Sequence, residues 1–256
     1  MINTKPLYSL LEKITFGNGL HRMINGIDVK LPAKYVRYFP SDYEKDNFEF
    51  LRSCCGEGAT ILDIGAHIGL FSIMAAQTAG EYGKIFAFEP SPGTADILQQ
   101  TIRINELGKL INPVNQAIGK EVGRQAFYIS DAEAYSGNSL VQHKQGSKPH
   151  TVQVEVNTID NFVMTKKLSK INFINIDVEG AEYDALLGGI QVFKKYKPHF
   201  IVAIHPELIG KKGDRLEAIY DLLEQLRYDI VCKGEYISKE KFCSNRELMQ
   251  LHLIPL

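Results

Sequence analysis

The stretch from Thr60 to Gly69, TILDIGAHIG, constrains the fold more than any other part of the chain. The apolar run Ile61–Ile64 predicts a buried strand, the glycines predict a tight turn, and a helix is expected from about Ile68. Gly65 allows a positive φ and the close approach of a ligand, and Gly69 allows the helix to pack tightly on the strand. Such a unit is typical of a parallel α/β sheet, which binds ligands at its carboxyl edge. A glycine turn with a purely structural role is the alternative.

Two cofactors compete for this turn, a dinucleotide and S-adenosylmethionine (SAM). A dinucleotide turn reads G-x-G-x-x-G and holds a pyrophosphate at the start of the helix. Here His67 replaces the middle glycine, and Asp63 stands two residues before the first one. A carboxylate at that place repels a pyrophosphate but attracts the ammonium group of a methionine moiety. SAM is therefore favoured over NAD, and the expected contacts come from Asp63, Gly65, Ala66, His67 and Gly69.

Length and charge exclude several classes of protein. The chain has 256 residues, which fits one large α/β domain with additions. Its net charge of -1 provides no basic field for phosphates, so no nucleic-acid partner is expected. The 4 cysteines lack C-x-x-C spacing and suggest neither a zinc site nor a disulfide frame, which favours a cytoplasmic location. No run of the sequence resembles a signal peptide or a membrane span, so no membrane partner is expected, and a homo-oligomer stays open.

Residues 1–57 read as an N-terminal extension before the main domain, 58–256. Asn25-Gly26 within Arg22–Leu31 predicts a β-hairpin. Ser41 to Glu44 reads S-x-x-E, a capping box, and predicts a helix that presents Phe48, Leu51 and Cys55 on one face. This extension is expected to cover one side of the sheet. The sharper hypothesis is that it roofs a substrate pocket lined by Tyr35, Tyr38 and Tyr43.

The next strands add residues for an adenosyl group. Glu89 ends the predicted strand Lys84–Glu89, where an acid can accept both hydroxyls of a ribose. NAD and SAM share that ribose, so Glu89 favours neither cofactor over the other. Ile111–Ile118 is the third strand and its exit, which places Asn115 or Gln116 near the adenine.

The pattern changes between Gly119 and about Val156, where short alternating segments flank the polar loop SGNSLVQHKQGSKP. We expect an antiparallel insertion with a long loop. The parallel sheet resumes with Ile171–Asp177, which ends in an acid on the same carboxyl edge, and continues with His199–His205. Tyr228–Cys232 and Gln250–Leu256 predict a closing antiparallel pair, which favours a methyltransferase sheet over a dinucleotide sheet.

The motifs DIGAHIGLFS, AFEPSP, NQAIG, SGNSL, NTID and INIDVEGAE occur in the order that they have in FkbM methyltransferases, which this chain resembles from Ile61 to about Glu207. The resemblance implies a Rossmann-like class I methyltransferase fold, with a seven-stranded, mostly parallel sheet and helices on both faces. It also implies SAM-dependent methylation of a hydroxyl group of a sugar, glycan or secondary metabolite. By resemblance, Asp63, Gly65 and Gly69 form the methionine loop, Glu89 is the ribose acid, and Asp177 and Glu179 are the acids nearest the reaction.

One position departs from the family pattern. The fifth strand of these proteins commonly ends in a glutamate two residues before a histidine, but this chain has Ala203 there, in VAIHPE. His205 is present and Glu207 follows it. If the missing glutamate binds the acceptor in the family, this protein either uses Glu207 or takes a different acceptor.

Methyl transfer to an aliphatic hydroxyl needs alignment and a base. The candidate bases are His205, Asp177 and Glu179, all expected near the carboxyl edge of the sheet, and Asp177 is also expected to contact the cofactor. In an alternative mechanism, Asp177, Glu179 and Glu182 would hold a Mg²⁺ ion that lowers the pKa of the hydroxyl. Negative charge at a helix N-terminus accounts for two of these acids without a metal, so no metal ligand is assigned.

Two other functions remain as alternatives. A nicotinamide-dependent oxidoreductase or epimerase would use the same sheet and Glu89, but Asp63, His67 and the absence of a Tyr-x-x-x-Lys pair disfavour it. A non-catalytic SAM-binding protein would not need the acids after the fourth strand. Nitrogen acceptors are disfavoured because Asp177-Val178-Glu179-Gly180 stands where N-P-P-Y or D-P-P-Y would be expected.

Overall fold

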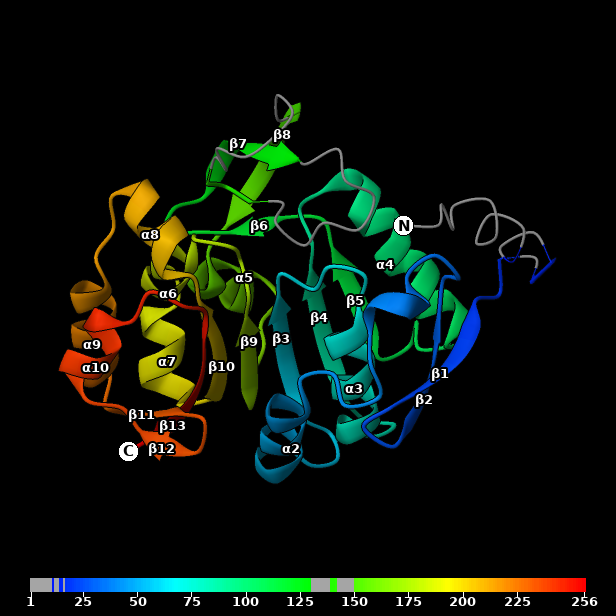
Figure 1. Cartoon of the computed structure of the whole chain (residues 1–256), viewed down its shortest axis with the longest axis horizontal. Coiled ribbons are helices and arrows are strands. Elements are labelled where there is room, and N and C mark those ends of the chain that lie inside the picture. The colour runs from blue at the N-terminus through cyan, green and yellow to red at the C-terminus, as the bar shows by residue number, and fades with distance from the viewer. Residues whose placement is uncertain (1–10, 12–13, 16, 130–138, 142–149) are drawn as a thin grey trace.

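The computed structural model describes residues 11, 14–15, 17–129, 139–141 and 150–256. Its centre is an eight-stranded sheet (Figure 1). The strands follow one another across the sheet in the order β12 Glu235–Tyr236, β11 Tyr228–Cys232, β13 Met249–Pro255, β10 His199–Ile204, β9 Phe173–Ile176, β3 Thr60–Ile64, β4 Lys84–Phe88 and β5 Ile111–Val114. Strand β3 lies in the interior of the sheet and all five of its residues are buried, as its apolar run predicts.

The strand directions confirm the predicted methyltransferase sheet. Strands β5, β4, β3, β9 and β10 pair in parallel, so their carboxyl ends share one edge. Strand β13 inserts antiparallel between β10 and β11, which is the expected closing pair. The seven predicted strands are present, and β12 adds a short eighth strand that pairs with the end of β11.

Helices cover both faces of this sheet (Figure 1). Alternating strand residues point to opposite sides, so Ile61 and Ile85 join one core while Leu62 and Phe86 join the other. The first face is covered by α2 Lys45–Cys54, α3 Leu70–Ala79 and α4 Pro92–Ile104. The second face is covered by α5 Ile159–Thr165, α6 Glu182–Leu187, α7 Ile190–Tyr196, α9 Leu216–Gln225 and α10 Lys239–Ser244. Helix α8, Pro206–Lys212, follows β10 directly.

The N-terminal segment packs on the first face. Strands β1 Leu20–Ile24 and β2 Ile27–Leu31 form the predicted hairpin, and both turn residues, Asn25 and Gly26, have positive φ. The short helix η1, Val36–Tyr38, leads toward α2. The capping-box prediction is wrong, because α2 begins only at Lys45 and its N-cap residue is Glu44, whose side chain makes no cap hydrogen bond.

The insertion after β5 forms a separate three-stranded sheet. Strands β7 Gly123–Ile129 and β8 His150–Asn157 pair antiparallel as predicted, and β6 Ala117–Ile118 pairs with β8 in parallel. The predicted strand Ile111–Ile118 is thus divided between the two sheets. Most of the polar loop between β7 and β8 lies outside the described residues. In the described part of the chain, no helix is long and apolar enough to span a membrane.

Candidate functional site

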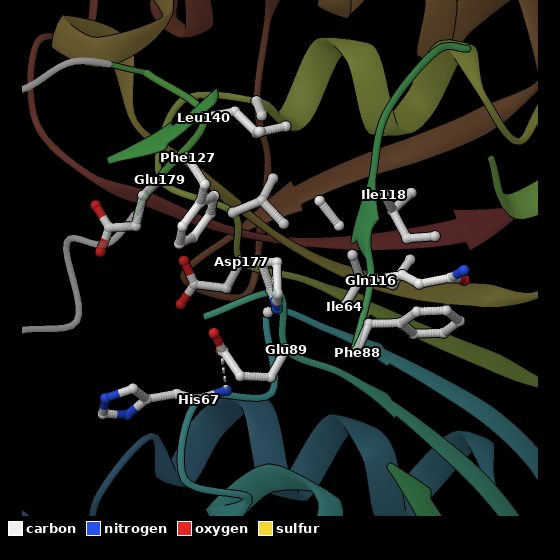
Figure 2. A pocket seen from close by; sticks show the side chains of 15 residues that line it. Ile64, His67, Phe88, Glu89, Gln116, Ile118, Phe127, Leu140, Asp177 and Glu179 are labelled. Carbon is white, nitrogen blue, oxygen red and sulfur yellow. Dashed lines mark hydrogen bonds between the residues drawn. The ribbon is translucent and has the colours of Figure 1, made fainter. Parts of the chain in front are cut away.

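Two cavities open beside the carboxyl edge of the parallel strands. The first has about 530 Å³ of empty space that includes open solvent, and Figure 2 shows its side chains. The carboxylates of Glu89, Asp177 and Glu179 lie on the left of that view, and Gln116 and Ile118 lie on the right. The apolar part of the wall consists of Ile64, Phe88, Pro90, Ala117, Ile118, Phe127, Leu140, Val178 and Ala181. Phe127 and Leu140 belong to the insertion, and the alternating pattern of that segment gave no sign that these side chains reach the site.

The glycine turn after β3 borders both cavities. Its backbone amides are used within the protein: Gly65 and Ala66 donate to the carbonyl oxygen of Phe88 at 3.0 and 2.9 Å, and His67 donates to Oε2 of Glu89 at 3.1 Å. These three amides are therefore not free to bind a ligand. Burial lowers the pKa of His67 to about 4, so its ring is neutral at pH 7.

Gly69 lies behind this turn and lines neither cavity. It has a φ of +93°, and a Cβ there would lie 2.6 Å from Cδ1 of Leu98 in α4. The glycine thus permits close packing on α4, whereas the sequence suggested packing on the strand.

Asp63 is fully buried beneath the turn. Its carboxylate accepts hydrogen bonds from Ser72 in α3 and, at 3.0 Å, from Nδ2 of Asn175 in β9. Burial raises its pKa to about 6, although both hydrogen bonds oppose that shift. At neutral pH the group is mostly ionised, and it ties strand β3 to two neighbouring elements.

Glu89 follows β4 and lies almost fully buried in the wall of the first cavity. Its Oε2 accepts the amide of His67 and its Oε1 accepts the amide of Ser91 at 2.9 Å. Burial raises the pKa of Glu89 to about 8, even though these two hydrogen bonds favour the charged form. The carboxyl group of Glu89 is therefore mostly protonated at pH 7.

The structure separates the two residues proposed for the adenine. Gln116 lines the first cavity, and its Oε1 accepts a hydrogen bond from Asn157. Asn115 instead donates through Nδ2 to the carbonyl oxygens of Glu89 and Pro90, so it holds the backbone behind the cavity.

A cluster of four ionisable side chains, the His205 cluster, gathers at the ends of β9 and β10. It comprises Asp177, Glu179, Glu182 and His205. Nδ1 of His205 lies 2.8 Å from Oε1 of Glu182, and Nε2 lies 3.8 Å from Oδ1 of Asp177 and 3.5 Å from Oε2 of Glu179. The sequence did not predict the contact between Glu182 and His205.

The pKa values of this cluster follow from burial and mutual charge. Burial alone would lower the pKa of His205, but the hydrogen bond and charge of Glu182, with Asp177 and Glu179, raise it to about 9. Burial raises the pKa of Asp177 to about 7, against the opposing charge of His205, and it raises the pKa of Glu179 as well. His205 is therefore protonated at pH 7, while Asp177 is partly ionised.

The second cavity, about 570 Å³ including open solvent, shares Asp177, Glu179 and the glycine turn with the first. The N-terminal segment supplies Phe39, Tyr43 and Glu44 to its wall. Burial and the neighbouring Glu44 raise the pKa of Tyr43, so the phenol stays neutral. Of the three tyrosines proposed as lining, only Tyr43 reaches this cavity.

The other two tyrosines lie elsewhere. Tyr35 is buried in the core beneath the hairpin, and the side chain of Tyr38 is exposed. Glu207 is also outside both cavities, because it is exposed on α8 and pairs with Lys211. Ala203 is buried in β10 opposite Gln250 of β13.

Comparisons with known proteins find related methyltransferases. The sequence profile described as the methyltransferase FkbM domain matches residues 63–230. The chain is 26% identical over 144 residues to Methyltransferase 1 of Beauveria bassiana (50% of this chain and 57% of that protein). It is 25% identical over 173 residues to the hexuronic acid methyltransferase AglP of Haloferax volcanii (68% and 67%).

Among solved structures, the methyltransferase FkbM from Methylobacillus flagellatus KT aligns with 98% of this chain and 58% of its own, with a TM-score of 0.50 and 15% identity. The chain thus spans a little over half the length of this structure and of the Beauveria relative. The structural likeness supports the fold, and the profile match extends from Asp63 in β3 through β10 to Ile230 in β11. This chain belongs to the methyltransferase FkbM domain family.

Proposed function

We propose that the chain transfers a methyl group from SAM to a hydroxyl oxygen of a sugar, glycan or secondary metabolite. The observation that carries the proposal is that both cavities share Asp177 and Glu179 in their walls. A cofactor in the first cavity and an acceptor in the second would meet at these carboxylates. The FkbM domain supports methyl transfer, and the name of the Haloferax relative supports a carbohydrate acceptor.

The residues of the first cavity fit an adenosyl group. Each oxygen of Glu89 accepts one backbone N–H and keeps a lone pair for a ribose hydroxyl. Ile118, Phe127 and Leu140 offer an apolar surface for an adenine ring, and Gln116 offers a polar contact at its edge. Asp63, buried beneath the turn, lines the second cavity, and its charge favours the ammonium group of the methionine part where the two cavities meet.

When bound, SAM supplies a methyl group on a positively charged sulfur, so the new carbon–oxygen bond forms as the carbon–sulfur bond breaks. Asp177 is the proposed base for the proton of the acceptor hydroxyl, because a group with a pKa near the operating pH serves best. Protonated His205 is a poor base, and its charge holds the neighbouring carboxylates in place. Alignment of the acceptor supplies at most roughly 7 to 11 kcal/mol, and a base adds roughly 10²- to 10⁴-fold in rate.

Two variants separate cofactor binding from catalysis. At pH 8.5, where Glu89 is mostly ionised, Glu89→Gln should weaken SAM binding about tenfold, because a charged acceptor of the ribose hydroxyls becomes neutral. Asp177→Asn should keep SAM affinity within a few-fold and lower kcat by roughly 10²-fold or more. SAM affinity is measured by calorimetry, and methyl transfer is measured with labelled SAM over a panel of hexuronic acids, neutral sugars and glycosylated metabolites.

Glu207→Gln is the matched control, since it removes one carboxylate outside both cavities. An unchanged kcat in Asp177→Asn would show that Asp177 is not the base, and Glu179 would then be the remaining candidate. Failure of the wild type to bind SAM would overturn the proposed function.

A further inference from the structure

The ring of His205 is fixed on one side and faces two carboxylates on the other. Its Nδ1 donates to Oε1 of Glu182, a side chain with no solvent exposure, at 2.8 Å. Loss of the Nε2 proton leaves the hydrogen on Nδ1, and Nε2 then presents its lone pair toward Asp177 and Glu179. A buried carboxylate on the far nitrogen of a histidine is the arrangement that orients metal-binding histidines in proteins.

The distances around Nε2 suit the ligands of one ion better than direct hydrogen bonds. The separations of 3.8 and 3.5 Å to the oxygens of Asp177 and Glu179 exceed the range of about 2.7 to 3.2 Å for a hydrogen bond. Metal bonds of about 2.0 to 2.2 Å place neighbouring ligands about 3.0 to 3.5 Å apart. The three ligand atoms all lie within 4.8 Å of one another, so a small inward movement of these side chains completes the set.

Two buried oxygens of the His205 cluster lack partners among the described residues. Oδ1 of Asp177 and Oε2 of Glu182 are closed off from solvent and accept no hydrogen bond. The other oxygen of Glu182, Oε1, already accepts hydrogen bonds from Nδ1 of His205 and from the amide of Gly180. Buried carboxylate oxygens without partners are costly, and a cation beside Asp177 would satisfy the oxygen that faces His205.

We infer that Asp177, Glu179 and His205 bind one divalent metal ion, with Glu182 as the positioning residue behind the histidine. The set differs from the magnesium alternative considered from sequence, because His205 replaces Glu182 as a ligand. One imidazole with two carboxylates suits Mn²⁺ and related first-row ions, whereas Mg²⁺ and Ca²⁺ favour oxygen ligands.

Both carboxylates line both cavities, so an ion bound by them would lie where the two cavities meet. The catalytic consequence rests on the proposed function: the ion would lower the pKa of the acceptor hydroxyl, while Asp177, bound through Oδ1, would keep its other oxygen to accept the proton.

The test measures Mn²⁺ binding to the chelator-treated full chain, without SAM or acceptor, from the electron paramagnetic resonance signal of free Mn²⁺. The wild type is expected to bind one equivalent. Asp177→Asn, Glu179→Gln and His205→Ala should each abolish saturable binding. Glu182→Gln should weaken it about 10- to 100-fold, as expected for a group that orients a ligand. Glu207→Gln, two residues after the histidine, should bind like the wild type.

Circular dichroism melts of every variant identify any that fail to fold, and the conservative Glu179→Gln keeps the test decisive if His205→Ala does not fold. Absence of saturable binding in the wild type, or equal binding in all variants, overturns the inference. Calorimetric titration of the same proteins with SAM is read separately, so that loss of the proposed function and loss of the metal site are distinguished.

Discussion

At Gly65 the chain turns with a φ of +89°, and an added Cβ would overlap the carbonyl oxygen of Asp177. Gly65→Ala is therefore expected to lower the free energy of unfolding by at least about 2 kcal/mol, through backbone strain and the displacement of the end of β9. Gly26→Ala is the matched control, because Gly26 has a φ of +79° but no atom within 4 Å of an added Cβ. Urea denaturation compares the two, and equal losses would show that strain alone accounts for the effect.

The raised pKa of Glu89 predicts how pH changes ligand binding. Ribose hydroxyls bind best to the ionised carboxylate, so binding to a group with a pKa of about 8 releases a proton. Affinity should therefore rise roughly 25-fold between pH 6.5 and 8.5 and level off above that range. The suitable ligand is 5′-methylthioadenosine, which keeps the ribose and lacks the amino-acid part. Calorimetry should find no such rise in Glu89→Gln, and a pH-independent affinity in the wild type would contradict the assignment.

At single residues, the sequence predicts the position of a side chain but not its contacts. The positions of Asp177, Glu179 and His205 on one edge follow from strand order, and the structure brings them together. Which neighbour each side chain contacts does not follow, because Glu182 and His205 are joined only by tertiary packing. For the same reason the sequence could not tell that Gln116 enters the cavity while Asn115 bonds to the backbone.

At the scale of elements, the segment that leads into α2 lines the second cavity and does not line the first. Glu44 has a φ of +46°, lines that cavity and accepts a hydrogen bond from Asn47. Glu44→Gln is expected to raise the KM for the acceptor several-fold and leave SAM affinity unchanged, because the residue is absent from the first cavity. The control Glu49→Gln changes an exposed acid on the same helix. Weaker SAM binding in Glu44→Gln would assign the segment to the cofactor instead.

The element boundaries that the sequence missed depend on contacts between distant segments. The apolar spacing after VEGAE predicts one helix to about Tyr196, but the chain forms α6 and α7 with Gly188 and Gly189 between them. A Cβ at Gly188 would overlap the carbonyl oxygen of Gly119, which belongs to the insertion. The break thus reflects close packing of two backbones far apart in sequence.

At the scale of the whole molecule, the sheet order could be predicted because each βα unit carries its own local signal. Buried apolar strands, glycine turns and the closing antiparallel pair identify a methyltransferase sheet. The boundary proposed at residue 57 stays a prediction. The hairpin and α2 share the core of the first face with α3 and α4, which gives the N-terminal segment a structural role in the described fold.

The central claim is that the first cavity binds the adenosyl part of SAM. Its most direct test is calorimetric titration of the wild type with SAM, S-adenosylhomocysteine and NAD⁺. We predict saturable binding of the first two, weakened in Glu89→Gln, and no binding of NAD⁺, because Asp63 and His67 disfavour a pyrophosphate at the glycine turn. Binding of NAD⁺ without SAM would contradict the cofactor assignment and the proposed methyl transfer with it.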